Sequence, residues 1–204
     1  MIKKKNVLIF AFFIFLGVLS FYFDKELIGF VSKIQFVGFQ NFFLSFALIY
    51  TEIIVLFVLT SLFLWNEKKR RWILPLWFTL FATAVVSFLI KFSVQRLRPY
   101  QADLIEALPI LIEKSHLVWN YSFPSFQSAL GFCALPILSK EFPRFKYFWI
   151  LIAFIIAFSR FYFGVHFMSD VIVGGILGYA IGLIVLKLEE DKRIFERIKN
   201  KLFR

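Results

Sequence analysis

The sequence is poor in cysteine and in acidic residues. It holds a single cysteine, Cys133, among 204 residues, and 13 acidic residues against 24 Lys and Arg. A lone thiol forms no intrachain disulfide and builds no zinc cluster, so neither can support this fold. The net charge of +11 would suit nucleic acid. The sequence also lacks an internal repeat, a low-complexity segment and a linker, and its length fits one domain over residues 1–204.

Apolar residues, in contrast, are abundant. They make up 60% of the chain, and 31 of them are Phe. A soluble domain is about 45–50% apolar. A chain of this length has too small a core to bury them all, so we expect much of this apolar surface to face lipid.

Six apolar segments approach the length of a membrane-spanning helix, which needs about 20 mostly apolar residues. They are 6–23, 42–65, 72–94, 124–139, 147–163 and 168–187. We therefore expect an all-α protein, a polytopic membrane bundle of six transmembrane helices. The first segment follows three lysines, as a signal peptide would, but no small-residue cleavage site follows it. This favours a retained anchor.

Three further segments carry apolar residues at helical spacing without the length to span a membrane. We expect these segments to form short interfacial helices that lie in the headgroup plane. They are 24–38, 103–119 and a tail stripe of Ile194, Phe195, Ile198 and Leu202. For the tail, a solvated helix is the alternative.

The basic residues gather in alternate connectors. Most of them lie before residue 6, in 68–71, in 140–146 and in the tail from Lys187 onward. By the positive-inside rule, these connectors and both termini are cytoplasmic. The basic excess then serves topology and contact with anionic lipid, and we expect no nucleic-acid partner. The expected location is the inner (cytoplasmic) membrane, crossed several times.

Polar residues cluster at the opposite ends of the spans. Such residues are costly at a membrane boundary and are therefore functional candidates. With a cytoplasmic N-terminus, all of these ends face outward, to the periplasmic side. The residues are Lys91, Arg96, Arg98, Ser125, Gln127, Ser159, Arg160, His166 and Asp170.

Three of these residues are typical of an anion site. Lys91 and Arg98 are seven residues apart, about two helical turns, so we expect them on one helix face, with Pro99 ending the helix. Arg offers a planar fork and Lys a point charge to a phosphate, whereas the alternative is snorkelling to headgroups. Ser125 is a favoured helix N-cap, and backbone N–H groups at a helix start bind anions. Plain capping is the alternative for Ser125.

His166 and Asp170 are four residues apart and adjacent on one helix face. A carboxylate beside one ring nitrogen fixes the tautomer and supports a positive charge on the ring. This is the orienting logic of the serine-protease triad, applied here to a histidine nucleophile. An isolated His–Asp pair can be structural, but cations at the same membrane face favour a catalytic role.

Together these motifs resemble a known signature. Lys91-x6-Arg98-Pro99, then Pro124-Ser125, then Ser159-Arg160-x5-His166-x3-Asp170 are similar in order and spacing to the three-part signature of the type-2 phosphatidic acid phosphatase superfamily. The motifs lie within 91–170. The resemblance implies one integral-membrane lipid phosphatase domain over 1–204, with a phospholipid or glycolipid phosphate as substrate.

The resemblance also implies residue roles. His166 would attack phosphorus and form a phosphohistidine, and Asp170 would orient it. The phosphate would be held by Lys91, Arg98, Ser125, Phe126, Ser159 and Arg160, with backbone amides near Ser125 contributing. No metal or other cofactor is implied, because the cations neutralise the charge that Mg²⁺ neutralises in other phosphoryl transfers.

One position departs from the family pattern. The second motif usually reads Pro-Ser-Gly-His, whereas this chain has Phe126 and Gln127 after Pro124-Ser125. An amide cannot deliver a proton to the leaving group, and general acid catalysis is worth about 10²–10⁴-fold. Three explanations stay open. Gln127 is an engineered inactivating change, or the leaving group of a lipid diphosphate needs little protonation, or the acid comes from elsewhere, for example His116.

The most specific prediction is a lipid A 1-phosphatase, a phosphoric monoester hydrolase, because Pro-Ser-Phe is reminiscent of those bacterial enzymes. Undecaprenyl diphosphate phosphatase and phosphatidylglycerophosphate phosphatase are the alternatives within the family. A lipid-phosphate-binding pseudoenzyme and a phosphoryl transferase are alternatives of other functional classes. The sequence assigns no role to Glu52 in the second span and no oligomeric state.

Overall fold

The structure is a computed structural model that describes residues 4–34, 58–65, 67–105 and 121–202. These residues are 87% helical and include no strand, which confirms the all-α prediction. The α-helices are α1 (Lys4–Ile34), α4 (Ile73–Val94), α6 (Phe126–Cys133), α7 (Leu135–Glu141), α8 (Lys146–Tyr162), α9 (Met168–Lys192) and α10 (Ile194–Leu202), and residues 58–65 are also helical. The short 3-10 helices are η1 (Glu67–Trp72), η2 (Pro99–Ala102) and η4 (Pro143–Phe145).

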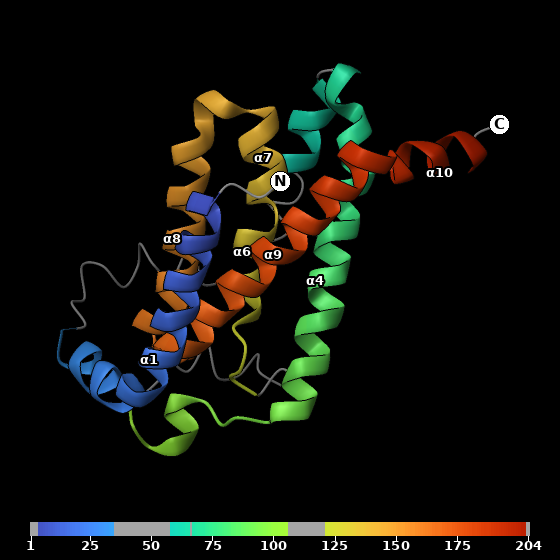
Figure 1. The fold of residues 1–204 in the computed structure, drawn as a ribbon. Coiled ribbons are helices and arrows are strands. Elements are labelled where there is room, and N and C mark those ends of the chain that lie inside the picture. Colours follow the sequence, from blue (N-terminus) through green and yellow to red (C-terminus); the bar gives the residue numbers. More distant parts are fainter. Residues whose placement is uncertain (1–3, 35–57, 66, 106–120, 203–204) are drawn as a thin grey trace.

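The long helices α4, α8 and α9 pack around α6, the following helix α7 lies against α8 and α9, and α1 lies at the edge of the bundle against α9 (Figure 1). The end of α4, the start of α6, the end of α8 and the start of α9 all lie in the same half of the bundle. This is the half where the sequence places its candidate site. The helix α10 projects from the opposite end of the bundle (Figure 1).

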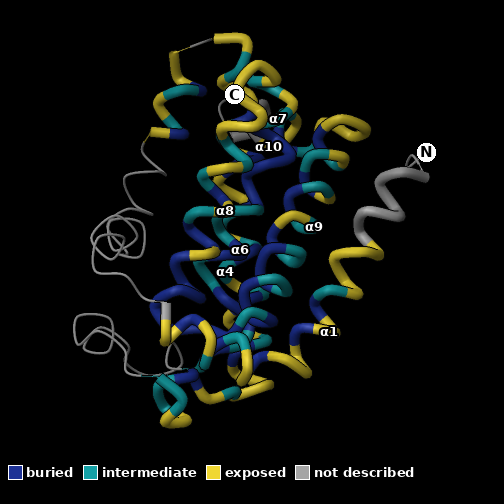
Figure 2. Tube along the Cα trace, turned by 90° about the vertical axis from the view of Figure 1, so that its left-hand side faces the viewer, coloured by how far each residue is buried: buried dark blue, intermediate teal, exposed yellow. Residues whose placement is uncertain are grey.

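Burial is arranged as expected for a protein surrounded by lipid. Large apolar side chains point outward, for example Phe15, Phe81, Phe92 and Leu151, and Phe81 is 66% exposed. Buried residues face the inside of the bundle (Figure 2). Three apolar stretches in the described ranges are long enough to cross a membrane, namely Glu67–Ala102, Pro143–Tyr162 and Met168–Lys192. By their length and composition, these three stretches indicate a membrane-bound protein. The expected count of six spans is not confirmed.

The interior contact between α6 and α9 depends on glycine. Gly174, Gly178 and Gly182 recur every four residues on one face of α9. A Cβ at Gly178 would lie 2.0 Å from the backbone oxygen of Ala129, far inside van der Waals contact. Small residues let helix backbones approach closely in membrane bundles. This close approach brings the start of α6 against the start of α9.

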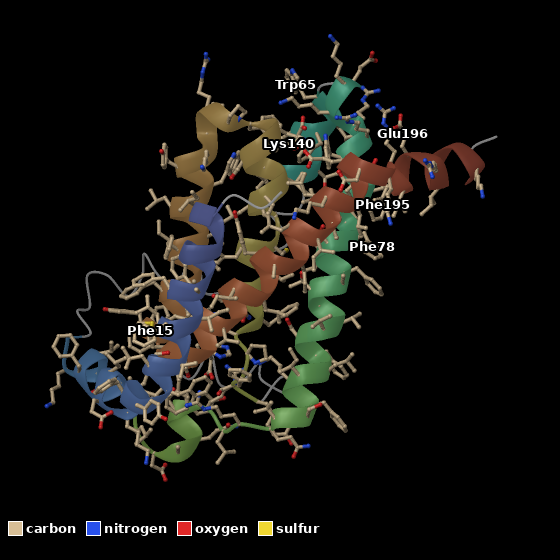
Figure 3. All side chains as sticks on the ribbon, viewed as in Figure 1. Phe15, Trp65, Phe78, Lys140, Phe195 and Glu196 are labelled. Atoms are coloured by element: carbon tan, nitrogen blue, oxygen red, sulfur yellow. The ribbon has the colours of Figure 1, made fainter. Side chains whose placement is uncertain are left out.

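The other end of the bundle is basic. Lys140 forms an ion pair with Glu190, and its Nζ lies 4.8 Å from the centroid of the Trp72 ring. Figure 3 shows Lys140 with Trp65 at this end of the molecule. Cations and aromatic rings together are typical of a membrane–water boundary. The basic connectors and the candidate site therefore lie at opposite ends, as charge patterning predicts.

Two expected segments differ from the structure. The segment 124–139 is not one continuous helix: it is two short helices, α6 and α7, joined at Ala134 with Pro136 in the first turn of α7. Proline lacks the N–H that a continuous helix would need there. The interfacial segment 24–38 is not separate from the first span, because α1 is continuous from Lys4 to Ile34, although its last turns leave the axis of the first part (Figure 1).

Other expected segments lie mostly outside the described residues. These are the second span, 42–65, with Glu52, and the interfacial segment 103–119, with His116. The tail stripe is confirmed as a helix, α10. The Glu189 side chain caps the N-terminus of α10: its Oε2 accepts a hydrogen bond from the Phe195 N–H at 2.8 Å. The Phe195 ring packs against Phe78, with ring centroids 5.1 Å apart (Figure 3).

Candidate active site

His166 lies in the tight turn between α8 and α9. Gly164 adopts a positive φ of 64°, and a Cβ there would lie 2.5 Å from Cγ2 of Ile105, so only glycine fits. The backbone N–H of His166 donates to the carbonyl of Arg160 at 3.2 Å. The imidazole is completely buried. The turn therefore fixes a buried histidine immediately before the N-terminus of α9.

The two ring nitrogens of His166 face different partners. Nε2 lies 3.3 Å from Nη1 of Arg98, and the same Nη1 donates to the carbonyl of Val165 at 2.8 Å. A guanidinium has only donors, so Nε2 must be the acceptor and the proton of the neutral ring must be on Nδ1. The hydrogen bond to Arg98 thus selects the tautomer with a lone pair on Nε2.

Asp170 faces the other ring nitrogen, as the four-residue spacing predicts. Its Oδ2 lies 3.7 Å from Nδ1 of His166, beyond hydrogen-bond distance. Nδ1 is buried and has no hydrogen-bond partner among the described residues. The same Oδ2 accepts from the Phe167 N–H at 2.8 Å at the start of α9. The structure therefore brings the pair together without closing the bond between them.

Lys91 reaches the site from α4. Its side chain is buried, and Nζ donates to the carbonyls of Tyr121 at 2.7 Å and Ser122 at 3.3 Å. These two residues lie three and two positions before Pro124, where the second motif begins. The backbone of the loop thus holds the ammonium group in place at the end of the helix.

The expectation that Lys91 and Arg98 share a helix face is wrong. The helix α4 ends at Val94, because Gln95 adopts a left-handed conformation with φ of 50°, and Arg98 lies in extended backbone. Pro99 begins η2 and does not end α4. The two cations still converge, because the loop after α4 folds back toward α9.

Ser125 is the N-cap of α6, as predicted. Its Oγ accepts from the Ser128 N–H at 3.4 Å, and its own N–H donates to the Asp170 carbonyl at 3.0 Å. A Cβ at Gly174 would lie 2.4 Å from the Ser125 carbonyl oxygen. The glycine therefore allows the second motif to sit directly against the start of α9.

Phe126 and Gln127 follow in the first turn of α6 and are half-buried. The position where the family has histidine is therefore at the helix start that adjoins His166 and Asp170. Backbone N–H groups of a first helical turn lack intrahelical partners, which suits an anion.

The third motif places Ser159 and Arg160 in the last turn of α8, and both are buried. The Ser159 hydroxyl donates to the carbonyl of Ile156 at 2.7 Å. It is thus turned to its own helix, a common arrangement for serine in membrane helices. Arg160 lies close enough to His166 for its positive charge to lower the pKa of that ring.

The charged groups that act most strongly on His166 are positive. Burial lowers the pKa of His166 well below its ordinary value of 6.5, and the nearby cations Arg98, Lys91 and Arg160 lower it further. These effects disfavour the imidazolium ion and outweigh the Ser122 backbone, which raises the pKa of His166 by a smaller amount. At neutral pH the ring is therefore uncharged, with a free electron pair on Nε2 in a field that suits a phosphate dianion.

Sequence reasoning missed a connected group at the same site. Arg96 was recognised only as a further cation, and Asp24 and Ser169 were not singled out. In the structure, Arg96 contacts Asp24, Ser169 and Asp170. One signal was available, because a carboxylate that ends an apolar run at a membrane boundary needs a partner. The identity of that partner, 72 residues further along the chain, was not visible.

The comparisons with known proteins agree with this geometry. The family model described as the PAP2 superfamily matches residues 72–194, more than half of the chain. This chain belongs to the PAP2 superfamily. Among the curated proteins, none matches this sequence.

Two solved structures resemble this PAP2 chain. The crystal structure of LpxE from Aquifex aeolicus, a lipid A 1-phosphatase, has 30% sequence identity and a TM-score of 0.62, and the match covers 79% of this chain and 93% of that one. The crystal structure of a transmembrane PAP2-type phosphatidylglycerolphosphate phosphatase from Bacillus subtilis has 20% identity and a TM-score of 0.70. That match covers 92% of this chain and 98% of the other, and at this identity it shows the fold alone. The predicted family is thus confirmed, together with the PAP2 membrane lipid phosphatase fold.

Proposed function

We propose that this PAP2 chain is a lipid phosphatase that works through a phosphohistidine on His166. The observation that carries the proposal is the contact between Nη1 of Arg98 and Nε2 of the buried His166 ring, at 3.3 Å. Arg98 fixes an electron pair on Nε2, and the cations that flank the ring lower its pKa, so the nucleophile is uncharged. A ring held only for structure would not need to present its lone pair to a cation.

In the first step, Lys91, Arg98 and Arg160 bind the phosphate oxygens, and the first turn of α6, after Ser125, contributes backbone N–H groups. Arg98 turns from Nε2 to a phosphate oxygen, which frees the electron pair. Nε2 then attacks phosphorus while the bond between phosphorus and the lipid oxygen breaks, and that oxygen keeps the electron pair of the bond and takes a proton from water. Asp170, which faces Nδ1, stabilises the positive charge that the ring gains.

In the second step, water attacks the phosphohistidine. The phosphorus–Nε2 bond breaks, inorganic phosphate leaves and the ring returns to its neutral form. The cations around the phosphate stabilise the charge of both transition states, and Lys91 does so from a position that its backbone contact to Tyr121 fixes in advance. Ser159 is assigned a weaker role in phosphate binding, since its hydroxyl must turn from Ile156 to reach the ligand.

We place the site on the periplasmic side of the inner membrane, with both termini cytoplasmic. The support is the separation of the basic end, with Lys140, from the end where α8 stops and α9 begins. The single domain over 1–204 would then carry six spans. A reporter protein that is active only in the cytoplasm tests this topology. It should be active when fused after Arg204 and inactive when inserted after Gln101.

The proposed substrate is a lipid A-type glycolipid phosphate. LpxE, at 30% identity, supports this choice over undecaprenyl diphosphate and phosphatidylglycerophosphate. Phosphate release should be measured on all three lipids, with this chain and with its Gln127→His variant. Release from the glycolipid at the highest kcat/KM supports the proposal. Preference for a diphosphate, with no gain from Gln127→His, would replace it with the second candidate.

Two outcomes of the same panel would identify other functions. Tight binding of the lipids by both proteins with no phosphate release would indicate a lipid-phosphate-binding pseudoenzyme. Release that depends on an added acceptor lipid, with the phosphate found on that lipid, would indicate a phosphoryl transferase.

A further inference from the structure

Arg96 bridges two carboxylates from opposite ends of the chain. Its Nη1 donates to Oδ1 of Asp170 and its Nη2 donates to Oδ2 of Asp24, both at 2.7 Å. Asp24 lies on α1, outside the family match, and its side chain is buried. An arginine fork with two nitrogens on two acceptors has a fixed orientation.

Ser169 closes the network. Its Oγ accepts from Arg96 Nη1 at 2.7 Å and donates to Oδ2 of Asp24, while its backbone N–H donates to Oδ1 of Asp24 at 3.1 Å. Asp24 therefore binds the first turn of α9 directly and through Arg96. The Arg96 guanidinium also stacks on Phe167, with its central carbon 4.0 Å from the ring centroid. These contacts leave little freedom for any of the polar groups.

The network determines where the Asp170 carboxylate lies. Arg96 holds Oδ1, and the Phe167 N–H holds Oδ2 on the side that faces His166. Without Arg96, the carboxylate could rotate about its last bond and turn Oδ2 away from Nδ1. Without Asp24, the charge of Arg96 would fall on Asp170 alone and would weaken the support that Asp170 gives to a charged ring.

We propose that Asp24 and Arg96 are positioning residues that aim the Asp170 carboxylate at Nδ1 of His166. The proposal rests on the proposed function for its kinetic consequences, but its structural consequence does not depend on turnover. Both residues act through Asp170, and Arg98, Lys91 and Arg160 remain the groups that bind phosphate.

The first test compares kcat with KM for Arg96→Lys and Asp24→Asn. Lysine keeps the charge but cannot bridge two carboxylates with a planar fork. We expect kcat to fall about 10–10²-fold in each variant, as for a misplaced catalytic group, with KM within about twofold. The exposed neighbour variant Lys25→Gln is the control and should keep both constants. A rise in KM with unchanged kcat would overturn the proposal and make Arg96 a direct phosphate ligand.

The second test is a double-mutant cycle with Asp170→Asn. If Arg96 acts through Asp170, then Arg96→Lys should cost little further activity once Asp170 is already Asn. Independent losses that multiply would contradict the proposal, because they would show a structural role for Arg96 that does not pass through Asp170. Melting temperatures in detergent identify any variant that fails to fold.

The third test needs no substrate. The chain has two histidines, so ¹⁵N-histidine NMR of the full-length protein in detergent, with His116→Gln to assign the signals, resolves the His166 ring. Because Arg98 is unchanged, we expect a protonated Nδ1 and an unprotonated Nε2 in every protein, but a displaced Nδ1 signal in Arg96→Lys and Asp24→Asn, where the Asp170 carboxylate beside Nδ1 has moved. The Nδ1 signal should be unchanged in Lys25→Gln. An unchanged Nδ1 signal in both network variants would overturn the proposal, even if phosphate release had failed on every lipid.

Discussion

Nη1 of Arg98 lies 3.3 Å from Nε2 of His166. Because arginine can only donate, this contact fixes both the tautomer of the histidine and the direction of its electron pair. The cation proposed to bind the phosphate is therefore aimed at the atom proposed to attack it. A phosphate that replaced this contact would find its nucleophile already oriented.

The first prediction concerns this contact. Arg98→Lys keeps the positive charge but loses the planar group whose Nη1 donates to both Val165 and His166. We expect kcat/KM for the preferred lipid to fall about 10–10²-fold, the typical effect of losing a charge-assisted hydrogen bond. Phosphate release by detergent-solubilised protein measures it. Arg197→Lys, at an exposed position of α10, is the control and should keep its kcat/KM. Equal activity of the Arg98→Lys protein would remove Arg98 from the site.

The second prediction concerns Gln127 at the start of α6. Restoring histidine should raise kcat about 10²-fold or more on a lipid phosphate monoester, because the leaving oxygen then receives a proton. On a lipid diphosphate the gain in kcat should be small. The leaving group is then a phosphate with a second pKa of about 6, which needs little protonation to depart. Parallel assays with the two substrate types measure the difference. A gain on neither would show that the proton comes from another group.

The third prediction concerns pH. The pKa of His166 is lowered below 6.5 by burial and by the neighbouring cations, so the ring stays neutral until the pH falls well below that value. In ¹⁵N NMR, we expect the His166 signals to titrate with a midpoint below 6.5. An added phosphate dianion should move the midpoint upward, because it favours the charged ring. A midpoint at or above 6.5 without ligand would contradict the assigned environment.

The same shift has a consequence for stability. The unfolded chain, with an ordinary histidine, binds a proton at a higher pH than the folded chain does. Below about pH 6.5 the unfolded state therefore gains protons first, and the free energy of unfolding decreases as the pH falls toward the folded pKa of His166. Above about pH 6.5, His166 is neutral in both the folded and the unfolded chain, so its contribution to the free energy of unfolding no longer changes with pH.

The fourth prediction concerns the contact between α6 and α9. Gly178→Ala places a Cβ 2.0 Å from the Ala129 carbonyl, so the helices must separate. We expect a loss of about 1–3 kcal/mol in stability, measured by thermal unfolding in detergent, together with lower activity, because α6 carries Ser125. Gly29→Ala on α1, where nothing lies within 4 Å of the added Cβ, is the control. That variant should be neutral or gain about 1 kcal/mol from helix propensity. Similar losses in both variants would contradict this account of the contact.

Several parts of the site could be predicted from the sequence because consecutive membrane-spanning helices alternate in direction. Helices that cross a membrane in turn bring every second end to the same side, so Lys91, Ser125, Arg160 and His166 had to meet in one half of the bundle. The N-cap at Ser125 and the neighbouring positions of His166 and Asp170 follow from local backbone geometry. The basic connectors lie at the other end for the same reason.

Other parts depend on tertiary contacts that no local pattern reports. The left-handed conformation at Gln95 ends α4 early and separates Arg98 from the helix of Lys91. The break at Ala134 divides an apolar run that reads as one span. The bridge from Asp24 to Asp170 through Arg96 joins α1 to α9, and periodicity within either helix carries no information about it.

The most direct test of the central claim is to trap the phosphoryl group on the protein. A lipid labelled with ³²P in its phosphate is mixed with the Gln127→His protein and the reaction is quenched in alkali within its first turnover. We expect an acid-labile, alkali-stable label on the protein in the peptide that contains His166, and no label in a His166→Asn protein that still binds phosphate. Phosphate release with no labelled protein, or a label that persists in His166→Asn, would contradict a phosphohistidine at this residue.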